Sequence, residues 1–299
     1  MVMKETSKKP KSNGLWQRFI DAVISYLSIF MFKLLDVIPY KKRVRFGGLL
    51  MERFLSKAMG YRKRIINNLT YIYPEMATSD VQALADRVSN NVGRSIVELS
   101  SAKDLMEAAA RAPLLGDGVQ ALIAATNSNK PVILVSGHFG NYDAVRYAML
   151  NRNLNVGGLY RKMRQSKFND LYVARISTVG GVLFPRSRSG MAKMVRFLKE
   201  GNILALLIDQ HMKAGVRLDF LGKPAYTALS AAEMALKYNA VIFPIYGVRQ
   251  PDGLSFEIQV EAPIEHTDAE TMTQELNDSL SKMVNAHKEQ WFWVHKRWK

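Results

Sequence analysis

Short apolar segments alternate with amphipathic segments along the chain from residue 131 onward. The apolar segments are rich in β-branched residues and predict strands at 131–137, 155–160, 181–185, 202–209, 240–248 and 255–262. Helical patterns lie between or after them at 142–151, 167–178, 190–199, 228–238 and 267–289. The early strands are apolar almost throughout, which is typical of a sheet covered on both faces. The pattern therefore predicts an α/β fold with a mixed, mostly parallel central sheet flanked by helices.

The chain before residue 131 predicts helices after a polar start. Residues 60–110 read as helices, with Thr78–Asp80 as the cap of a long one. Residues 1–14 predict a disordered basic tail. Within 15–40 the uncharged run is only 11 residues long, whereas a membrane span needs about 20. A polar stripe and flanking basic residues instead predict a membrane-attaching amphipathic helix, with a helix packed on its own domain as the alternative.

Composition adds a strong positive charge and removes some chemistry. The formal net charge is +16, and residues 41–64 hold nine Lys/Arg against one Glu. Such a surface favours anionic partners: nucleic acid, anionic lipid or an acidic carrier protein. The sequence has none of the zinc-ligand, basic-heptad or aromatic-rich patterns typical of nucleic-acid binding. With no cysteine, disulfides, thiolate nucleophiles and cysteine metal sites are excluded.

The segment 131–143, PVILVSGHFGNYD, places a histidine at the end of a predicted strand. Because sites in α/β sheets gather at the carboxyl ends of strands, His138 is a candidate catalytic base. Asp143 follows in the first turn of the next predicted helix, and a turn at Gly137 and Gly140 would bring its carboxylate to the imidazole. The acid would orient the ring while the other ring nitrogen takes a proton from a hydroxyl. A structural histidine at a strand end is the alternative.

Polar residues near other predicted strand ends extend this candidate site. Asn141 is suited to cap the helix after His138, where exposed amides would bind a developing oxyanion. Asp209 ends another buried strand and is either an additional site acid or a helix cap. Four arginines are candidates for binding an anionic acceptor, because guanidinium groups bind phosphate oxygens: Arg161, Arg164, Arg175 and Arg186. Exposed surface charge is the alternative for all four, and only the first and last directly follow strands.

The segment His138–Asp143 resembles the His-x4-Asp/Glu block of glycerolipid acyltransferases, and its form HFGNYD is similar to the late (lauroyl or myristoyl) acyltransferases of lipid A biosynthesis. Similar blocks follow in order: Tyr160–Lys162, Phe184–Arg186, Asp209–Gln210, Gly215–Val216, Phe220–Ala225, Phe243–Ile245 and Glu289–Trp298. Broader glycerolipid acyltransferases often carry a glutamate where Arg186 stands. This departure argues against a glycerol-phosphate enzyme and leaves the acceptor open.

The resemblance implies a single acyltransferase domain over 41–299, attached to the cytoplasmic face of a bacterial inner membrane. It implies O-acylation of a lipid A precursor or a closely related anionic glycolipid, with acyl-acyl carrier protein, or else acyl-CoA, as the donor. The basic segment 41–64 would hold acidic headgroups and dock the carrier. No G-x-S-x-G elbow surrounds Ser136, so a covalent acyl-enzyme is not expected. No residues have metal-ligand spacing and no phosphate loop is present, so we expect neither metal nor cofactor.

Other functions stay open on the sequence alone. The acceptor of an acyltransferase is alternatively a lysophospholipid, an amino-acid lipid or another glycolipid. Outside enzymes, the alternative is an anionic-membrane or nucleic-acid binding protein with a degenerate site. The C-terminal Trp291, Trp293 and Trp298 are interpreted as packing or interface anchors, and His295 as structural.

Overall fold

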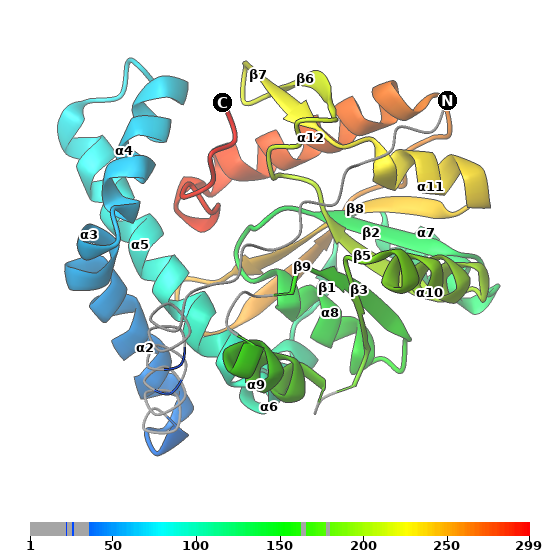
Figure 1. Cartoon of the computed structure of the whole chain (residues 1–299), viewed down its shortest axis with the longest axis horizontal. Helices are drawn as coiled ribbons and strands as arrows, with labels where there is room; N and C mark the ends of the chain where they lie inside the picture. Colours follow the sequence, from blue (N-terminus) through cyan, green and yellow to red (C-terminus); the bar gives the residue numbers. More distant parts are fainter. Residues whose placement is uncertain (1–21, 23–25, 27–35, 163–165, 178–179) are drawn as a thin grey trace.

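The computed structural model describes residues 22, 26, 36–162, 166–177 and 180–299. Its centre is a sheet with the strand order β1-β9-β8-β2-β5-β3-β4 among these residues (Figure 1). The strands are β1 (Leu114–Leu115), β2 (Val132–Ser136), β3 (Val156–Tyr160), β4 (Val182–Pro185), β5 (Ile203–Leu207), β8 (Val241–Arg249) and β9 (Phe256–Val260). Neighbouring strands pair in parallel except β8 and β9, which are antiparallel. The predicted mixed, mostly parallel sheet is confirmed, and each predicted strand is present.

Helices cover both faces of the sheet, as the continuous apolar strands predicted. Successive side chains of a strand point to opposite faces. In β2, Val132 and Leu134 join one core, and Ile133 and Val135 join the other. The first face is covered by α6 (Ala102–Ala110), α7 (Val119–Asn127) and α8 (Tyr142–Leu150), and the second by α10 (Arg188–Lys199), α11 (Ser230–Tyr238) and α12 (Ala269–Ala286).

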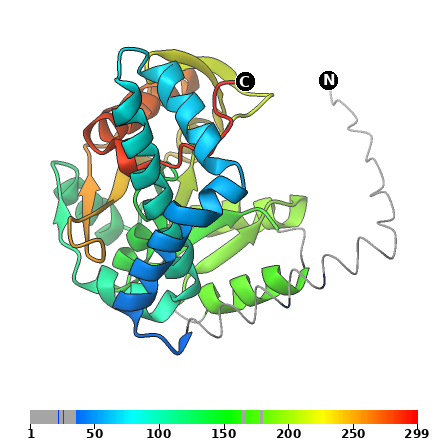
Figure 2. The same ribbon diagram turned by 90° about the vertical axis from the view of Figure 1, so that its left-hand side faces the viewer.

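A third group of helices, from the N-terminal part, packs against one end of the sheet and its covering helices (Figure 2). It comprises α2 (Tyr40–Leu50), the π-helical turn η1 (Met51–Leu55), α3 (Ser56–Ala58), α4 (Tyr61–Ile72) and α5 (Thr78–Ser100). Its apolar side chains share a core with α12 and the C-terminal tryptophans. The predicted cap at Thr78–Asp80 is displaced by one residue: Ala77 occupies the N-cap position and makes no side-chain capping bond.

Two further elements complete the described chain. Helix α9 (Ser166–Ser177) contacts α5 and β4, and an antiparallel hairpin joins β6 (Val216–Phe220) to β7 (Lys223–Thr227). The hairpin was not predicted. In the described part of the chain, no helix combines the length and the apolar character that crossing a membrane requires. The predicted tail 1–14 and most of the predicted membrane-attaching helix 15–40 lie outside the described residues.

Candidate active site

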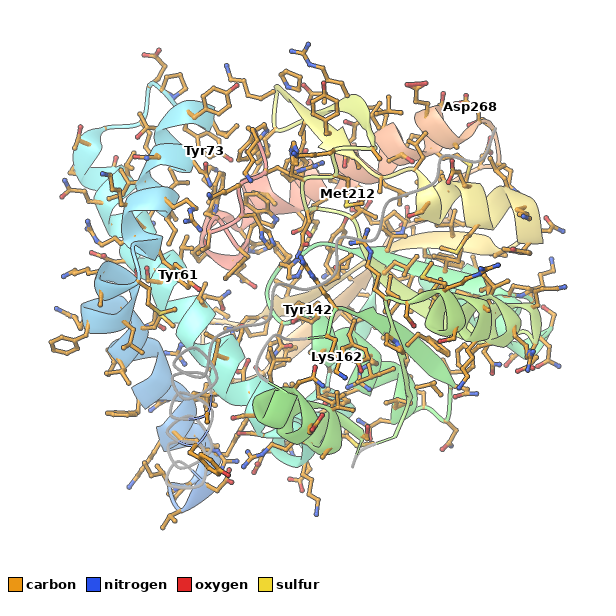
Figure 3. All side chains as sticks on the ribbon, viewed as in Figure 1. Tyr61, Tyr73, Tyr142, Lys162, Met212 and Asp268 are labelled. Atoms are coloured by element: carbon orange, nitrogen blue, oxygen red, sulfur yellow. The ribbon has the colours of Figure 1, made fainter. Side chains whose placement is uncertain are left out.

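The candidate site lies at the carboxyl ends of β2 and β5, which are neighbours in the sheet. Their parallel register pairs Ser136 with Leu207. His138 and Asp209 each follow two residues later, so both side chains leave the sheet at the same height. As a result, His138 Nδ1 lies 2.7 Å from Asp209 Oδ1. Figure 3 shows Tyr142, which follows this strand end, in the middle of the molecule.

Asp209 is fully buried, and donors surround its carboxylate. Oδ1 accepts from the ring of His138, while Oδ2 accepts from the backbone N–H of His138 at 2.7 Å and from the indole N–H of Trp291 at 2.9 Å. Burial raises the pKa of Asp209, but the charge and hydrogen bonds of His138 outweigh it and lower the pKa below its ordinary value. An ionised Asp209 accepts from Nδ1–H, which leaves Nε2 of His138 as the nitrogen that can take a proton.

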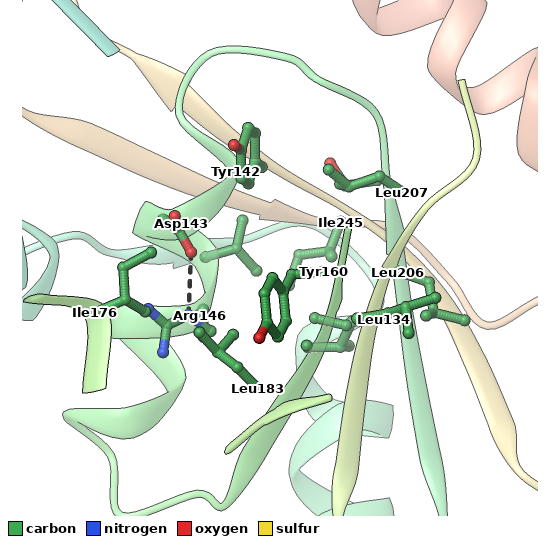
Figure 4. A pocket seen from close by; sticks show the side chains of 15 residues that line it. Leu134, Tyr142, Asp143, Arg146, Tyr160, Ile176, Leu183, Leu206, Leu207 and Ile245 are labelled. Carbon is green, nitrogen blue, oxygen red and sulfur yellow. Dashed lines mark hydrogen bonds and ion pairs between the residues drawn. The ribbon is translucent and has the colours of Figure 1, made fainter. Parts of the chain in front are cut away.

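Asp143 lies in the first turn of α8, as predicted, but its carboxylate is held by Arg146 rather than by His138 (Figure 4). Arg146 Nε donates to Asp143 Oδ1 at 3.0 Å, and both residues are buried. The two side chains are three residues apart on one helix and therefore share a face. The expected contact of Asp143 with the imidazole is thus corrected. Asp209 supplies the carboxylate, and because residues 208–215 are irregular, it does not cap a helix.

The loop between β2 and α8 is held in place by its own amides. Asn141 caps α8 as predicted, because its Oδ1 accepts from the N–H of Asp143 at 3.0 Å. The loop amides from His138 to Asn141 all donate within the protein: to Asp209 Oδ2, Gly137 O, Gln290 O and Gly247 O. These four amides are therefore occupied within the protein, whereas the expectation that exposed amides around Asn141 bind a developing oxyanion stays a prediction.

Two glycines allow this loop to lie so close to its neighbours. A Cβ atom on Gly137 would lie 2.8 Å from the Leu280 side chain and 3.1 Å from Asp209 Oδ2. Gly140 has a φ of 52°, and a Cβ there would lie 2.0 Å from Gly247 O. The sequence predicted a turn at these glycines, and that turn now brings His138 to Asp209.

A buried ion pair supports the loop from the side of α5. Arg249, at the end of β8, donates to both carboxylate oxygens of Glu98, at 2.5 and 2.6 Å. Asn141 Nδ2 donates to Glu98 Oε2 at 2.7 Å, so the capping residue joins the same network. Glu98 is fully buried. Sequence analysis missed this pair, because its members are 151 residues apart.

The arginine candidates separate into different environments. Strands β3 and β4 pair Tyr160 with Pro185, so Arg161 and Arg186 follow at the same height on the site edge, and both are exposed. Arg175 contacts Asp36 at 2.7 Å and the carbonyl of Ser100 at 2.5 Å, which ties α9 to the N-terminal part. Arg164 lies outside the described residues.

The C-terminal segment forms one wall of the site, which the sequence did not predict. Beyond the bond from Trp291 to Asp209, the ring of His295 lies edge-on against that of His138, with centroids 4.5 Å apart. Burial lowers the pKa of His295 to about 4, so it is neutral at neutral pH. The tryptophans at 291–298 were the one sequence feature that could have indicated this wall, because a buried indole N–H needs a hydrogen-bond acceptor.

An apolar pocket opens beside the loop. It is lined mainly by residues of α8, β2, β3 and β5, and α9, β4 and β8 add one residue each. Leu134, Leu183, Leu206 and Ile176 are among its aliphatic side chains (Figure 4). Tyr142 lines the pocket and also contacts the ring of His138, with centroids 5.3 Å apart. The pocket therefore begins next to the histidine and runs along the sheet face that α8 covers.

Among the described residues, one group has the composition of a metal site. His138, Asp209 and His295 offer ligand atoms that lie within 4.8 Å of one another. The 2.7 Å between His138 and Asp209 is the length of a hydrogen bond, which accounts for that pair without an ion. Buried Arg297 also places a positive charge near Asp209, which disfavours a second cation.

Comparison with known proteins gives consistent results over nearly the whole chain. A family model described as bacterial lipid A biosynthesis acyltransferase matches residues 16–299. The lipid A biosynthesis acyltransferase of Haemophilus influenzae is 22% identical over 294 residues, covering 96% of this chain and 87% of that protein. The lipid A biosynthesis lauroyltransferase of Escherichia coli is 22% identical over 291 residues, covering 92% and 91%. A phosphatidylinositol mannoside acyltransferase of Mycobacterium tuberculosis is 20% identical over 185 residues, covering 60% of this chain and 58% of that protein.

Proposed function

Because the chain belongs to the bacterial lipid A biosynthesis acyltransferase family and is an acyltransferase, we propose that it acylates a hydroxyl of a lipid A precursor or a closely related anionic glycolipid. The proposed donor is acyl-acyl carrier protein, with acyl-CoA as the alternative. The observation that carries the chemistry is the contact between His138 and the buried carboxylate of Asp209 at the strand ends.

In the proposed reaction, His138 acts as general base. Its Nε2 takes the proton of the acceptor hydroxyl while the oxygen attacks the thioester carbonyl. The tetrahedral intermediate collapses, the new ester forms, and the carbon–sulfur bond breaks. The imidazolium returns its proton to the departing thiolate, which regenerates the neutral base. Asp209 orients the ring and stabilises the imidazolium, the role that the sequence had given to Asp143.

The apolar pocket beside His138 is the proposed site of the acyl chain. Its lining is mostly aliphatic, and Tyr142 links its mouth to the histidine. A chain lying there would place its thioester carbonyl at the loop. Ser136 also lines the pocket, but its buried hydroxyl has no hydrogen-bond partner among the described residues, so no base activates it. Direct transfer without an acyl-enzyme is therefore the proposed route.

The acceptor's negative charge is proposed to lie on Arg161 and Arg186. The two arginines follow paired positions on β3 and β4, on the same edge of the sheet as His138. Guanidinium groups bind phosphate oxygens through two parallel hydrogen bonds. The likeness to a phosphatidylinositol mannoside acyltransferase supports a second candidate acceptor, another anionic glycolipid, which the same arginines would suit.

Membrane attachment at the cytoplasmic face of a bacterial inner membrane is proposed from the family and from the surface of α2. Phe46 and Leu49 on α2 and Phe54 on η1 are 49%, 50% and 67% exposed. Exposed basic residues lie among them, including Arg45 and Arg53. Apolar side chains with interspersed cations are suited to the interface of an anionic membrane. The same cations would attract an acidic carrier protein.

The proposal is tested by lipid analysis with a matched variant. Mass spectrometry compares lipids from cells lacking the protein with lipids from cells that express the wild type or His138→Ala. Only the wild type is expected to add one acyl group, and the mass reports acceptor and chain together. In a purified assay His138→Ala should lose transfer while keeping its circular dichroism spectrum. Transfer by this variant near the wild-type rate would sink the base assignment.

A further inference from the structure

Trp291 contacts the proposed acid directly, although it lies in the segment that the sequence marked only for packing. Its side chain is fully buried, and its indole N–H donates to Asp209 Oδ2 at 2.9 Å. Asp209 Oδ1 is left to the ring of His138. One carboxylate oxygen therefore serves the imidazole, and the other is held by two N–H donors from different parts of the chain.

The segment that carries Trp291 pairs, through its backbone, with the catalytic loop, which is the loop between β2 and α8 at residues 137–141. Phe139 and Trp291 form a β-bridge. On either side of it, Gly140 N–H donates to Gln290 O and Phe292 N–H donates to His138 O, both at 2.9 Å. These backbone contacts fix the position from which the Trp291 side chain reaches the carboxylate of Asp209.

We propose that Trp291 is a positioning residue of the transferase: its indole N–H holds the Asp209 carboxylate in the rotation that presents Oδ1 to His138 Nδ1. The inference rests on the proposed roles of His138 and Asp209. Without the indole N–H, Oδ2 keeps a single donor, the His138 amide. The carboxylate then has rotational freedom about its χ2 torsion, and the imidazole loses its fixed partner.

Trp293 offers a matched control within two residues. It is also fully buried, and its ring lies edge-on to that of Trp291, with centroids 4.8 Å apart. Its indole N–H, however, donates to the carbonyl of Lys288 at 2.7 Å and not to the site. Changing either tryptophan to phenylalanine removes the same atoms from the same core. Only Trp291→Phe removes a hydrogen bond to Asp209.

The segment has a second anchor that both variants keep. Arg297 is buried and donates to Tyr226 O at 2.7 Å and to Thr227 Oγ1 at 2.6 Å, which holds the end of the chain on β7. The segment is therefore expected to stay in place when Trp291 changes.

The experiment measures kcat, KM and the NMR resonance of the His138 Nδ1–H proton in both variants of the full-length protein. Trp291→Phe is expected to lower kcat about 10- to 100-fold, the effect of losing one hydrogen bond to a charged group, with little change in KM. Trp293→Phe is expected to stay within about threefold of the wild type. In ¹⁵N-histidine-labelled protein, the downfield resonance of Nδ1–H should shift or broaden only in Trp291→Phe.

A second variant separates the hydrogen bond from the shape of the side chain. Incorporating 3-benzothienylalanine at position 291 keeps the bicyclic ring and replaces the N–H with sulfur. The same loss of kcat and the same change in the resonance are expected. Equal behaviour of the two phenylalanine variants, or a benzothienyl protein with wild-type kcat and resonance, would overturn the proposal. If the wild type transfers no acyl group, the proposed function fails, and the resonance still reports on Trp291.

Discussion

At the scale of single residues, the site contains two buried carboxylates with different partners. Asp209 faces an imidazole, which gains a proton in the proposed reaction, whereas Asp143 faces a guanidinium, which is permanently charged. Only the first pairing couples a carboxylate to a group that changes charge. The second is a buried ion pair within α8, and both of its residues line the apolar pocket.

We therefore expect the two aspartates to fail in different ways. Asp209→Asn should lower kcat by about 10⁴-fold, as happens when the acid that orients a catalytic histidine becomes an amide. Asp143→Asn should keep a larger share of kcat. It should instead lower the free energy of unfolding by about 3 kcal/mol, because it removes the charge that buried Arg146 contacts. Steady-state kinetics and urea unfolding of both variants measure the two effects.

A double variant provides the control for that prediction. Asp143→Asn combined with Arg146→Met replaces the ion pair with uncharged groups and should recover most of the lost unfolding free energy. If Asp143→Asn instead lowers kcat as far as Asp209→Asn does, Asp143 takes part in the reaction and the division of roles is wrong.

The sequence identified the histidine and both acids, but it paired the histidine with the nearer acid. His138 and Asp143 are five residues apart, and that closeness made the pair visible. His138 and Asp209 are 71 residues apart, and they meet because β2 and β5 are neighbours in register. Strand order is a property of the whole sheet and leaves no mark in a local pattern. The same reason hides Trp291, whose partner lies 82 residues away.

At the scale of elements, the buried pair of Glu98 and Arg249 joins α5, β8 and the start of α8. We expect Glu98→Ala to lower the free energy of unfolding by about 3–5 kcal/mol, because it leaves a buried guanidinium without its counter-charge. It should also lower kcat, because Asn141 loses the acceptor that fixes the catalytic loop. Urea unfolding and kinetics measure both.

A second acid on the same helix is a matched control. Asp86 pairs with Arg62 at 2.7 Å, but its side chain is 39% exposed. Asp86→Ala should therefore cost less than about 1 kcal/mol and leave kcat unchanged. A similar loss of stability in both variants would mean that helix α5, rather than the buried pair, accounts for the effect.

The elements that the sequence predicted well are those with a strong apolar signal. The apolar run over β2 predicted a strand covered on both faces, and all five of its residues are buried. The hairpin of β6 and β7 was missed because neither strand has the continuous apolar run of the central strands, and because β7 contains Pro224, which argues against a strand. Its two-residue turn also hides its signal, since Leu221, with a φ of 55°, stands before Gly222. A leucine is uncommon at a position that favours asparagine or glycine.

At the scale of the whole molecule, part of the basic segment 41–64 turns out to serve the fold. Arg43 is buried and pairs with Asp36 and Asp104, and Arg62 pairs with Asp86. The cations that stay exposed on α2 to α4 are Lys41, Lys42, Arg45, Arg53, Lys57 and Lys63. The proposed membrane-facing surface is therefore narrower than the sequence indicated, and it is mixed with exposed apolar side chains rather than purely basic.

This surface predicts how the whole protein binds lipid. Phe46→Ser combined with Leu49→Ser should weaken sedimentation with vesicles of mixed zwitterionic and anionic phospholipid by at least about tenfold, because both side chains lose their apolar contact. Raising the salt concentration should also weaken vesicle binding by the wild type. The net charge is +16, and its attraction to anionic lipid is screened beyond a Debye length of about 8 Å at 0.15 M salt. Ile123→Ser changes a side chain on α7 that is 43% exposed, and it should leave binding unchanged. Equal binding by the double variant and the wild type would place the lipid contact elsewhere on the protein.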